Sequence, residues 1–207
     1  MAESFLKALS AFVGTEGIRD RKLTQAMGLL SGALTRLTPA DEESARISQP
    51  VVDRHLNDAL SAGVGTPVDL IRSVVGSVSW IVPYPEYAGE PDMDAMRASY
   101  AFAPLIAAGK DSFKDDAVSA VSAPYLSDEV FVGLVLQGPN CDYPSHVHKS
   151  EEVFWVASGT ADWQRGDDWR VEEPGGVIHH ASGVRHATVT RHEPLLMLFA
   201  WVTDPHC

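Results

Sequence analysis

The sequence predicts a mainly β protein, a double-sheet β-barrel of the jelly-roll type that follows an N-terminal helical extension. Three observations support this prediction. The first third of the chain repeats apolar residues at helical spacing. From Ser77 onward, apolar runs of strand length take over. Glycine and proline punctuate these runs, which is typical of double-sheet barrels built from many short strands.

Two apolar stripes predict helices in the first part of the chain. The first stripe has spacings of four and three residues, should end at Thr38-Pro39, and comprises Leu23, Met27, Leu30, Leu34 and Leu37. The second ends before Gly63 and Gly65 and comprises Val51, Val52, His55, Leu56, Ala59 and Leu60. Such stripes face a core. We therefore expect residues 1–76 to form a helical extension and residues 77–207 to form the barrel.

The predicted strands follow in order. Outside the segments discussed below they span residues 77–82, 100–106, 117–121, 130–136, 161–164, 169–171 and 195–202. A loop rich in proline and glycine separates the first two. Residues 165–168 should form the turn of a hairpin.

Composition excludes several classes of partner. The net charge of −12 argues against binding to nucleic acid or to an anionic membrane surface. No apolar run reaches membrane-spanning length, and the first residues do not resemble a signal peptide. The chain has two cysteines, Cys141 and the terminal Cys207, which favours a reducing compartment. We therefore expect a cytoplasmic homodimer with a small-molecule substrate.

One segment carries the chemistry. His146 and His148 are two residues apart, so they point to the same face of a strand. Glu152 follows four residues later, and His186 lies 38 residues beyond His148. Three imidazoles and one carboxylate suit a single divalent transition metal. Zinc or iron(II) is favoured, and manganese, cobalt and nickel also accept this ligand set.

The spacing of glycines strengthens this interpretation. The pattern is His146-x-His148-x3-Glu152-x6-Gly159, followed by Gly175-x5-Ala181-x-Gly183-x2-His186. This register resembles the two motifs of the cupin superfamily over roughly residues 98–207, with Ala181 and Thr190 in place of the usual proline and asparagine. A second register would use His179, but it leaves too little chain for the hairpin. We expect His179 and His180 near the barrel mouth, one of them supporting the ligands.

A narrower resemblance concerns the segment from Tyr143 to His186. Together with the helical N-terminus, it is similar to the cupin-type dimethylsulfoniopropionate lyases of the DddQ group. The resemblance implies a metal-dependent β-elimination that yields dimethyl sulfide and acrylate. Carried over residue by residue, it implies metal binding by His146, His148, Glu152 and His186. It also implies that Tyr143 is the catalytic base.

One position departs from that family. Where its members usually carry a tyrosine two residues after the metal-binding glutamate, this chain has Phe154. A phenyl ring cannot bind a metal or accept a proton. We expect Phe154 to face inward with Glu152 and to contact substrate, because aromatic faces attract a sulfonium cation. Trp80, Tyr84, Tyr87 and Tyr100 are further aromatic residues, and the sequence assigns none of them to a sulfonium cage.

Alternatives remain open at this point. Tyr143 is either the base or a rim residue that only hydrogen-bonds substrate. Three histidines and one glutamate also support dioxygenases and sugar-type isomerases. A metal-stabilised cupin that binds a small molecule without turnover is the third possibility. No basic helix accompanies the barrel to support a DNA-binding regulator.

Overall fold

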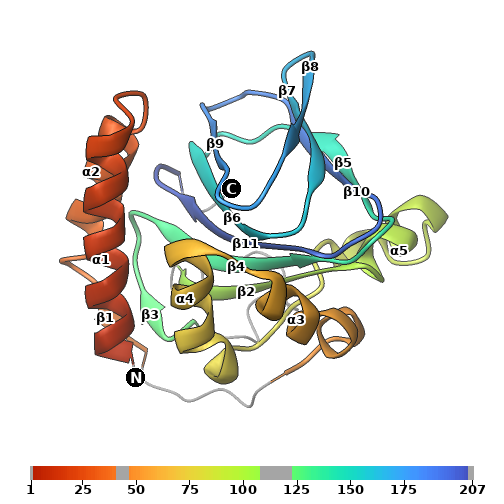
Figure 1. Ribbon diagram of the computed structural model, residues 1–207, viewed down its shortest axis with the longest axis horizontal. Coiled ribbons are helices and arrows are strands. Elements are labelled where there is room, and N and C mark those ends of the chain that lie inside the picture. Colours follow the sequence, from red (N-terminus) through yellow and green to blue (C-terminus); the bar gives the residue numbers. More distant parts are fainter. Residues whose placement is uncertain (1, 41–46, 108–122, 205–207) are drawn as a thin grey trace.

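Two β-sheets pack face to face, and helices cover the outer side of the larger sheet (Figure 1). The computed structural model describes residues 2–40, 47–107 and 123–204. The larger sheet has the strand order β1-β3-β2-β4-β11-β6-β9, and the smaller has the order β5-β10-β7-β8. The prediction of a mainly β fold preceded by helices is confirmed. Among the described residues the two sheets share no strand.

The helical elements precede most of the strands. They are α1 (Ala2–Arg19), α2 (Thr24–Ala33), α3 (Pro50–Ala62), α4 (Gly65–Val74), η1 (Val75–Ser77), η2 (Pro85–Tyr87) and α5 (Pro91–Arg97). The strands are β1 (Thr38–Pro39), β2 (Tyr100–Ala107), β3 (Tyr125–Leu126), β4 (Phe131–Gln137), β5 (Asp142–His146), β6 (Glu152–Ser158), β7 (Ala161–Arg165), β8 (Asp168–Glu172), β9 (Val177–His180), β10 (His186–Thr190) and β11 (Leu195–Trp201).

The first predicted helix is shorter than its apolar stripe. Helix α2 ends at Ala33, and the following residues turn back, with the backbone N–H of Arg36 donating to the carbonyl of Ala33 at 2.9 Å. The Arg36 guanidinium then binds the Glu129 carboxylate through two contacts of 2.8 and 2.6 Å. Residues Thr38–Pro39 form β1 and pair with β3 instead of capping a further turn. Tertiary pairing therefore ends the helix one turn early.

The second predicted helix is confirmed as α3. Val51, Val52 and Ala59 are buried on the face that the stripe predicts. Helices α3 and α4 pack on β6 and β11 of the larger sheet, and Figure 1 shows them beneath it. They shield one face of this sheet, so its other face is left to line the molecule's interior.

Three predicted strand segments had different outcomes. The hairpin of β7 and β8 is confirmed, with Arg165 paired to Asp168 across the turn. Residues 77–82 were wrongly predicted as a strand: only Ile81 forms a bridge, to Phe102. Pro83 and Pro85 follow at once and lack the N–H that a ladder needs, so pairing stops there. The predicted strand at 117–121 lies outside the described residues.

Strand β6 divides the interior from the helix layer. Val153 and Trp155 are buried in the cluster that includes the helices, whereas Phe154 belongs to the cluster between the sheets. Alternation along the strand therefore turns Glu152 inward with Phe154, as predicted. Both the carboxylate and the phenyl ring thus reach the space between the sheets.

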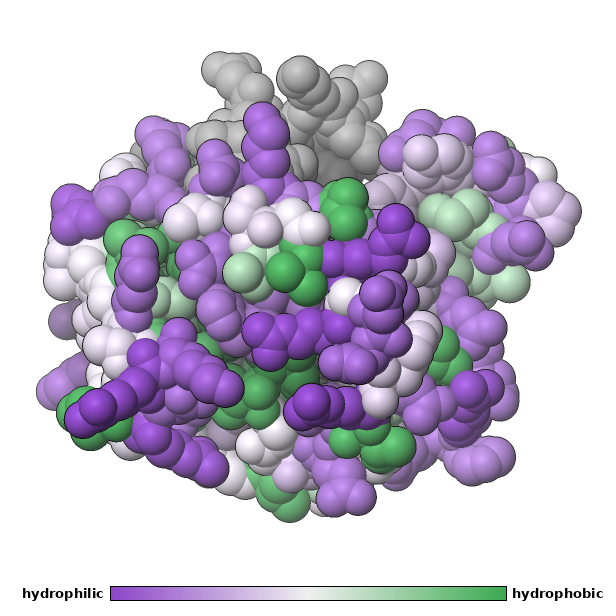
Figure 2. Space-filling model, turned by 90° about the horizontal axis from the view of Figure 1, so that it is seen from above, coloured by the Kyte–Doolittle hydropathy of each residue, from purple (hydrophilic) through white to green (hydrophobic). Residues whose placement is uncertain are grey.

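The outer surface is mostly polar. Figure 2 shows a face on which hydrophilic residues predominate and apolar residues lie in small separate groups. The net charge of −12 is consistent with this surface. No helix in the described ranges combines the length and the apolar character needed to cross a bilayer.

Candidate metal centre and active site

The four predicted ligands converge from both sheets. His146 ends β5 and His186 begins β10, and the two residues are register partners in the smaller sheet. His148 lies just beyond β5, and Glu152 begins β6 in the larger sheet. One ring nitrogen from each of His146, His148 and His186 lies within 4.8 Å of the others. The three histidines form a group that could bind a metal ion.

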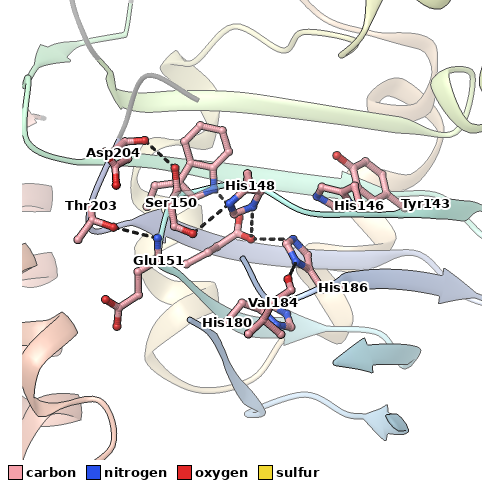
Figure 3. Close-up of polar contacts among 12 residues, drawn as sticks. Tyr143, His146, His148, Ser150, Glu151, His180, Val184, His186, Thr203 and Asp204 are labelled. Carbon is pink, nitrogen blue, oxygen red and sulfur yellow. Dashed lines mark hydrogen bonds and ion pairs between the residues drawn. The ribbon is translucent and has the colours of Figure 1, made fainter. Parts of the chain in front are cut away.

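Each of these histidines is held by a carbonyl two residues away. The Nδ1 atoms of His146 and His186 lie 3.0 and 2.9 Å from the carbonyl oxygens of Pro144 and Val184. The Nδ1 atom of His148 lies 3.0 Å from the carbonyl oxygen of Ser150 (Figure 3). A carbonyl only accepts, so each Nδ1 must carry the proton. In the neutral ring the lone pair then lies on Nε2, the atom that remains for a metal.

Glu152 faces the three histidines from the opposite sheet. Its Oε2 atom lies 3.3 Å from Nε2 of both His148 and His186. Its Oε1 atom accepts a hydrogen bond of 2.7 Å from the indole N–H of Trp201. The carboxylate is 4% exposed. Trp201 therefore fixes one oxygen and leaves the other facing the histidines.

The charges in this cluster fit a cation. Burial acts to raise the pKa of Glu152, and the pKa falls to about 2 only where the facing His148 and His186 nitrogens present a proton or a positive charge to the carboxylate. Burial lowers the pKa of His146 to about 4, so this ring is neutral at pH 7. The buried Nε2 atom of His186 has no hydrogen-bond partner. Bare imidazole lone pairs facing a carboxylate repel it unless a positive charge lies between them, so these residues fit a divalent metal.

Tyr143 lies beside the histidines. Its ring centre is 5.0 Å from that of His146 in an edge-to-face arrangement, and Figure 3 shows the two side chains next to each other. The Tyr100 ring packs on its other side at 4.7 Å. Its hydroxyl shares a hydrogen bond of 2.6 Å with that of Tyr84, and either oxygen can be the donor. Burial, with Tyr84 and Tyr100 nearby, raises the pKa of Tyr143 well above its ordinary value.

Phe154 lines the interior behind the ligands. It is 8% exposed, and its ring lies 5.0 Å from that of Trp163 and 5.8 Å from that of Phe199. The nearest histidine ring among its aromatic contacts is that of His180, at 6.3 Å. The phenyl ring thus contributes an apolar surface to the site and no donor atom.

The two remaining motif histidines point to opposite sides of β9. His179 pairs with Glu151, with its Nε2 atom 2.7 Å from Oε1. His180 is fully buried and stacks on His186 with ring centres 4.3 Å apart. It accepts a hydrogen bond from the Trp163 indole N–H at 2.8 Å. His180 therefore supports the face of a ligand ring, while His179 lies outside the ligand group.

Sequence analysis missed the roles of several aromatic residues. Trp201, Trp163 and Tyr84 each contact a motif residue through a hydrogen bond. They lie far from those residues in the chain, so local spacing carries no signal for them. Register gives one partial clue: Trp201 and His180 both pair with Glu152, on its two neighbouring strands.

A family model and a curated protein match this chain. The family model described as dimethylsulfoniopropionate lyase matches residues 24–197. The curated dimethylsulfoniopropionate lyase DddQ of Ruegeria pomeroyi is 30% identical over 109 residues, which cover 52% of this chain and 54% of that protein. The alignment therefore spans about half of the length of this relative.

Two solved structures are similar over nearly the whole chain. The crystal structure of DMSP lyase DddQ from Ruegeria pomeroyi has a TM-score of 0.68 at 23% identity, covering 99% of this chain and 93% of that one. A chain from the crystal structures of the DMSP lyases RdDddP and RnDddQII has a TM-score of 0.66 at 22% identity, covering 99% and 95%. These likenesses show that the chain has the fold of these two structures. Because the family model matches most of its length, the chain belongs to the dimethylsulfoniopropionate lyase family.

Proposed function

We propose that this protein is a metal-dependent lyase that splits dimethylsulfoniopropionate into dimethyl sulfide and acrylate. The observation that carries the proposal is the convergence of three histidines, Glu152 and Tyr143 on one interior site. His146, His148, Glu152 and His186 would hold one divalent ion, with zinc or iron(II) favoured over manganese, cobalt or nickel. Membership of the family gives the substrate class.

The reaction is a β-elimination. A base takes a proton from the carbon next to the carboxylate, and that C–H electron pair forms the new C=C bond. The bond between the β-carbon and sulfur breaks, and its electrons leave with dimethyl sulfide. Acrylate and one proton remain, so atoms and charge balance. When bound, the divalent ion supplies Lewis acidity that stabilises charge on the substrate carboxylate.

Tyr143 is the proposed base. It adjoins His146 and lies in the same interior, so its oxygen can face a substrate held at the histidines. Burial disfavours its anion, as the raised pKa records. A positive charge held by the neighbouring histidines acts in the opposite direction. The base role therefore depends on a loaded metal site.

Phe154 is the proposed contact for the sulfonium end. Its aromatic ring lies in the interior with Phe199 and Trp163, and aromatic faces attract such cations. Because it has no hydroxyl, proton removal rests on Tyr143. This assignment distinguishes the chain from family members that carry a tyrosine at the same position.

The function is tested with purified protein freed of metal and reconstituted separately with each of the five ions. Incubation with dimethylsulfoniopropionate should release dimethyl sulfide, measured in the headspace, and acrylate in equal amounts. Glu152→Ala, treated identically, is the control. A metal-loaded wild type that releases no more gas than Glu152→Ala would rule out the lyase. Turnover that consumes oxygen would instead identify a dioxygenase.

Tyr143→Phe tests the base. It keeps the ring and removes only the phenol oxygen. General-base catalysis contributes roughly 10²- to 10⁴-fold, so kcat should fall by that order while bound metal stays constant. A rim residue that only hydrogen-bonds substrate would instead raise KM at nearly unchanged kcat. The pH profile should also lose its rising limb with the base, and an unchanged profile would contradict the assignment.

A further inference from the structure

The oxygen of Tyr143 has a partner from a distant segment. Tyr84 precedes it by 59 residues, yet the two hydroxyl oxygens are 2.6 Å apart. The ring of Tyr143 also contacts those of Tyr100 and His146, with ring centres 4.7 and 5.0 Å apart. Those contacts restrict the ring but not the direction of the hydroxyl bond. Within the described part of the chain, Tyr84 is the side chain that forms a hydrogen bond with this oxygen.

The backbone of Tyr84 is strained. Its φ and ψ angles are 57° and 54°, which place it in the left-handed region. A bulky residue is rarely found there, because its side chain makes this conformation unfavourable. The other non-glycine residues with positive φ in the described chain are Asn140 and Asp204, types that tolerate this region better. The surrounding structure must therefore hold Tyr84 in place.

The contacts that hold it come from both sides of the residue. On one side Ile81 exchanges backbone hydrogen bonds of 2.8 and 2.9 Å with Phe102 on β2, the strand that also carries Tyr100. The guanidinium of Arg97 donates from Nε to the carbonyl of Pro83 at 3.1 Å. On the other side the Tyr84 carbonyl accepts from the N–H of Tyr87 at 3.1 Å. The segment is thus fixed to the sheet and to α5, which directs the Tyr84 side chain to Tyr143.

We propose that Tyr84 is a positioning residue that acts through Tyr143. Its hydroxyl orients the Tyr143 oxygen and donates a hydrogen bond to that oxygen while it takes the proton of the substrate. The proton of Tyr84 itself stays on Tyr84. This inference rests on the proposed lyase function, and it adds a residue outside the β-strand motifs to the site.

Kinetics of four variants test the inference. Tyr84→Phe keeps the ring and removes the hydroxyl. One lost hydrogen bond of about 1.4 kcal/mol corresponds to a tenfold lower kcat, and KM should change little. If Tyr84 acts through Tyr143, the double variant that combines Tyr84→Phe with Tyr143→Phe should have the same kcat as Tyr143→Phe alone. Tyr87→Phe is the matched control, because Tyr87 is 41% exposed and its ring lies 6.2 Å from that of Tyr84; it should retain the wild-type kcat.

Two kinetic outcomes would overturn the positioning role of Tyr84. One is a wild-type kcat in Tyr84→Phe. The other is a double variant in which the two single losses multiply, since this would mean that Tyr84 acts independently of Tyr143.

A second readout does not depend on turnover. In zinc-loaded protein labelled with ¹³C at the tyrosine Cζ atoms, Tyr84→Phe should shift the Tyr143 resonance and Tyr87→Phe should leave it in place. An unshifted Tyr143 resonance in Tyr84→Phe would refute the positioning role. If the wild type releases no dimethyl sulfide, the lyase proposal fails by itself, and the resonance still decides whether Tyr84 sets the Tyr143 hydroxyl.

Discussion

At the scale of single residues, the ligand side chains are held by their own segments. Each of the three histidines places Nδ1 on a carbonyl two residues away, and the Trp201 indole N–H donates to the Glu152 oxygen that faces away from the histidines. These hydrogen bonds therefore align the nitrogen and oxygen atoms that face one another in the site. Loss of one ligand should then remove a defined bond rather than disorder the site.

Replacing a ligand should remove the metal. In His148→Ala or Glu152→Ala, one of the four proposed ligands is gone, so most bound metal should be lost in elemental analysis. His179→Ala is the matched control, because His179 pairs with Glu151 outside the ligand group. Full occupancy in His186→Ala together with loss in His179→Ala would mean that the second motif uses the other register.

Phe154 offers a test of substrate chemistry at fixed metal content. Phe154→Tyr adds one hydroxyl to a ring that already faces the interior. The added oxygen is a second group able to accept the proton, so turnover of dimethylsulfoniopropionate should rise. Kinetics and elemental analysis are compared with those of the wild type. A lower kcat with unchanged metal content would contradict this and show that the phenyl ring is needed for packing against substrate.

His180 should make the protein sensitive to acid. Burial lowers its pKa to about 3, whereas an unfolded histidine titrates near 6.5. Between these values the unfolded chain binds a proton that the folded chain excludes, so the free energy of unfolding falls as pH decreases through this window. The slope for one group is up to about 1.4 kcal/mol per pH unit.

His180→Gln removes this titration and keeps an acceptor for Trp163. Chemical denaturation of metal-free protein at pH 6.5 and 5.0 measures the effect. The stability of the wild type relative to the variant should decrease by ~2 kcal/mol between the two pH values. Parallel changes in both proteins would contradict the role of His180.

At the scale of secondary-structure elements, the turn between β6 and β7 requires a glycine at position 159. Gly159 has a φ of 80°, and a Cβ atom there would lie 2.0 Å from the carbonyl oxygen of Pro194. Both the conformation and the space exclude a side chain. The turn places β6, and with it Glu152, opposite β11 and Trp201.

Gly159→Ala should therefore destabilise the fold strongly. We expect a loss of about 3 kcal/mol or more in the free energy of unfolding, because backbone would have to move. Gly28→Ala is the matched control: Gly28 lies inside α2 with no atom within 4 Å of the added Cβ, so this change should stabilise by about 0.5–1 kcal/mol. Equal melting temperatures for the two variants would contradict the clash at Gly159.

Local patterns predicted the elements whose signals lie within a few residues. The stripe of α3, the hairpin of β7 and β8, and the spacing of the ligands around β5 and β6 all belong to this kind. Residues 77–82 form only the Ile81 bridge because Pro83 and Pro85 follow at once, and here a local signal outweighed the strand pattern. One feature set by a distant contact escaped prediction: α2 ends early because β1 pairs with β3. The same holds in the site, where Trp201 and Tyr84 reach motif residues only through the fold.

At the scale of the whole molecule, the site joins the two sheets. His146 and His186 belong to the smaller sheet, and Glu152 belongs to the larger one. A metal held by all three would be a bond between two layers that share no strand in the described chain. The metal should then contribute to the stability of the fold as well as to chemistry.

Metal loading should raise the melting temperature. An ion present at about 100 times its dissociation constant stabilises the folded state by ~2.7 kcal/mol, if the unfolded chain does not bind it. Calorimetry of metal-free and reconstituted protein measures the shift. Glu152→Ala, which has lost the ligand from the larger sheet, should show a much smaller shift. If the wild type melts at the same temperature with and without metal, the proposed metal-mediated link between the two sheets is wrong.

The hydrogen bonds between the three histidines and nearby carbonyls have a consequence for which substitutions the site tolerates. Carbonyls within their own tripeptides accept hydrogen bonds from His146, His148 and His186, and Phe154 is not among the partners in these bonds. Interior rings such as Phe154 can therefore be exchanged without re-aiming the three histidine donors. Evolution can therefore change substrate specificity through single substitutions of residues that line the site, while the three histidines keep their orientation.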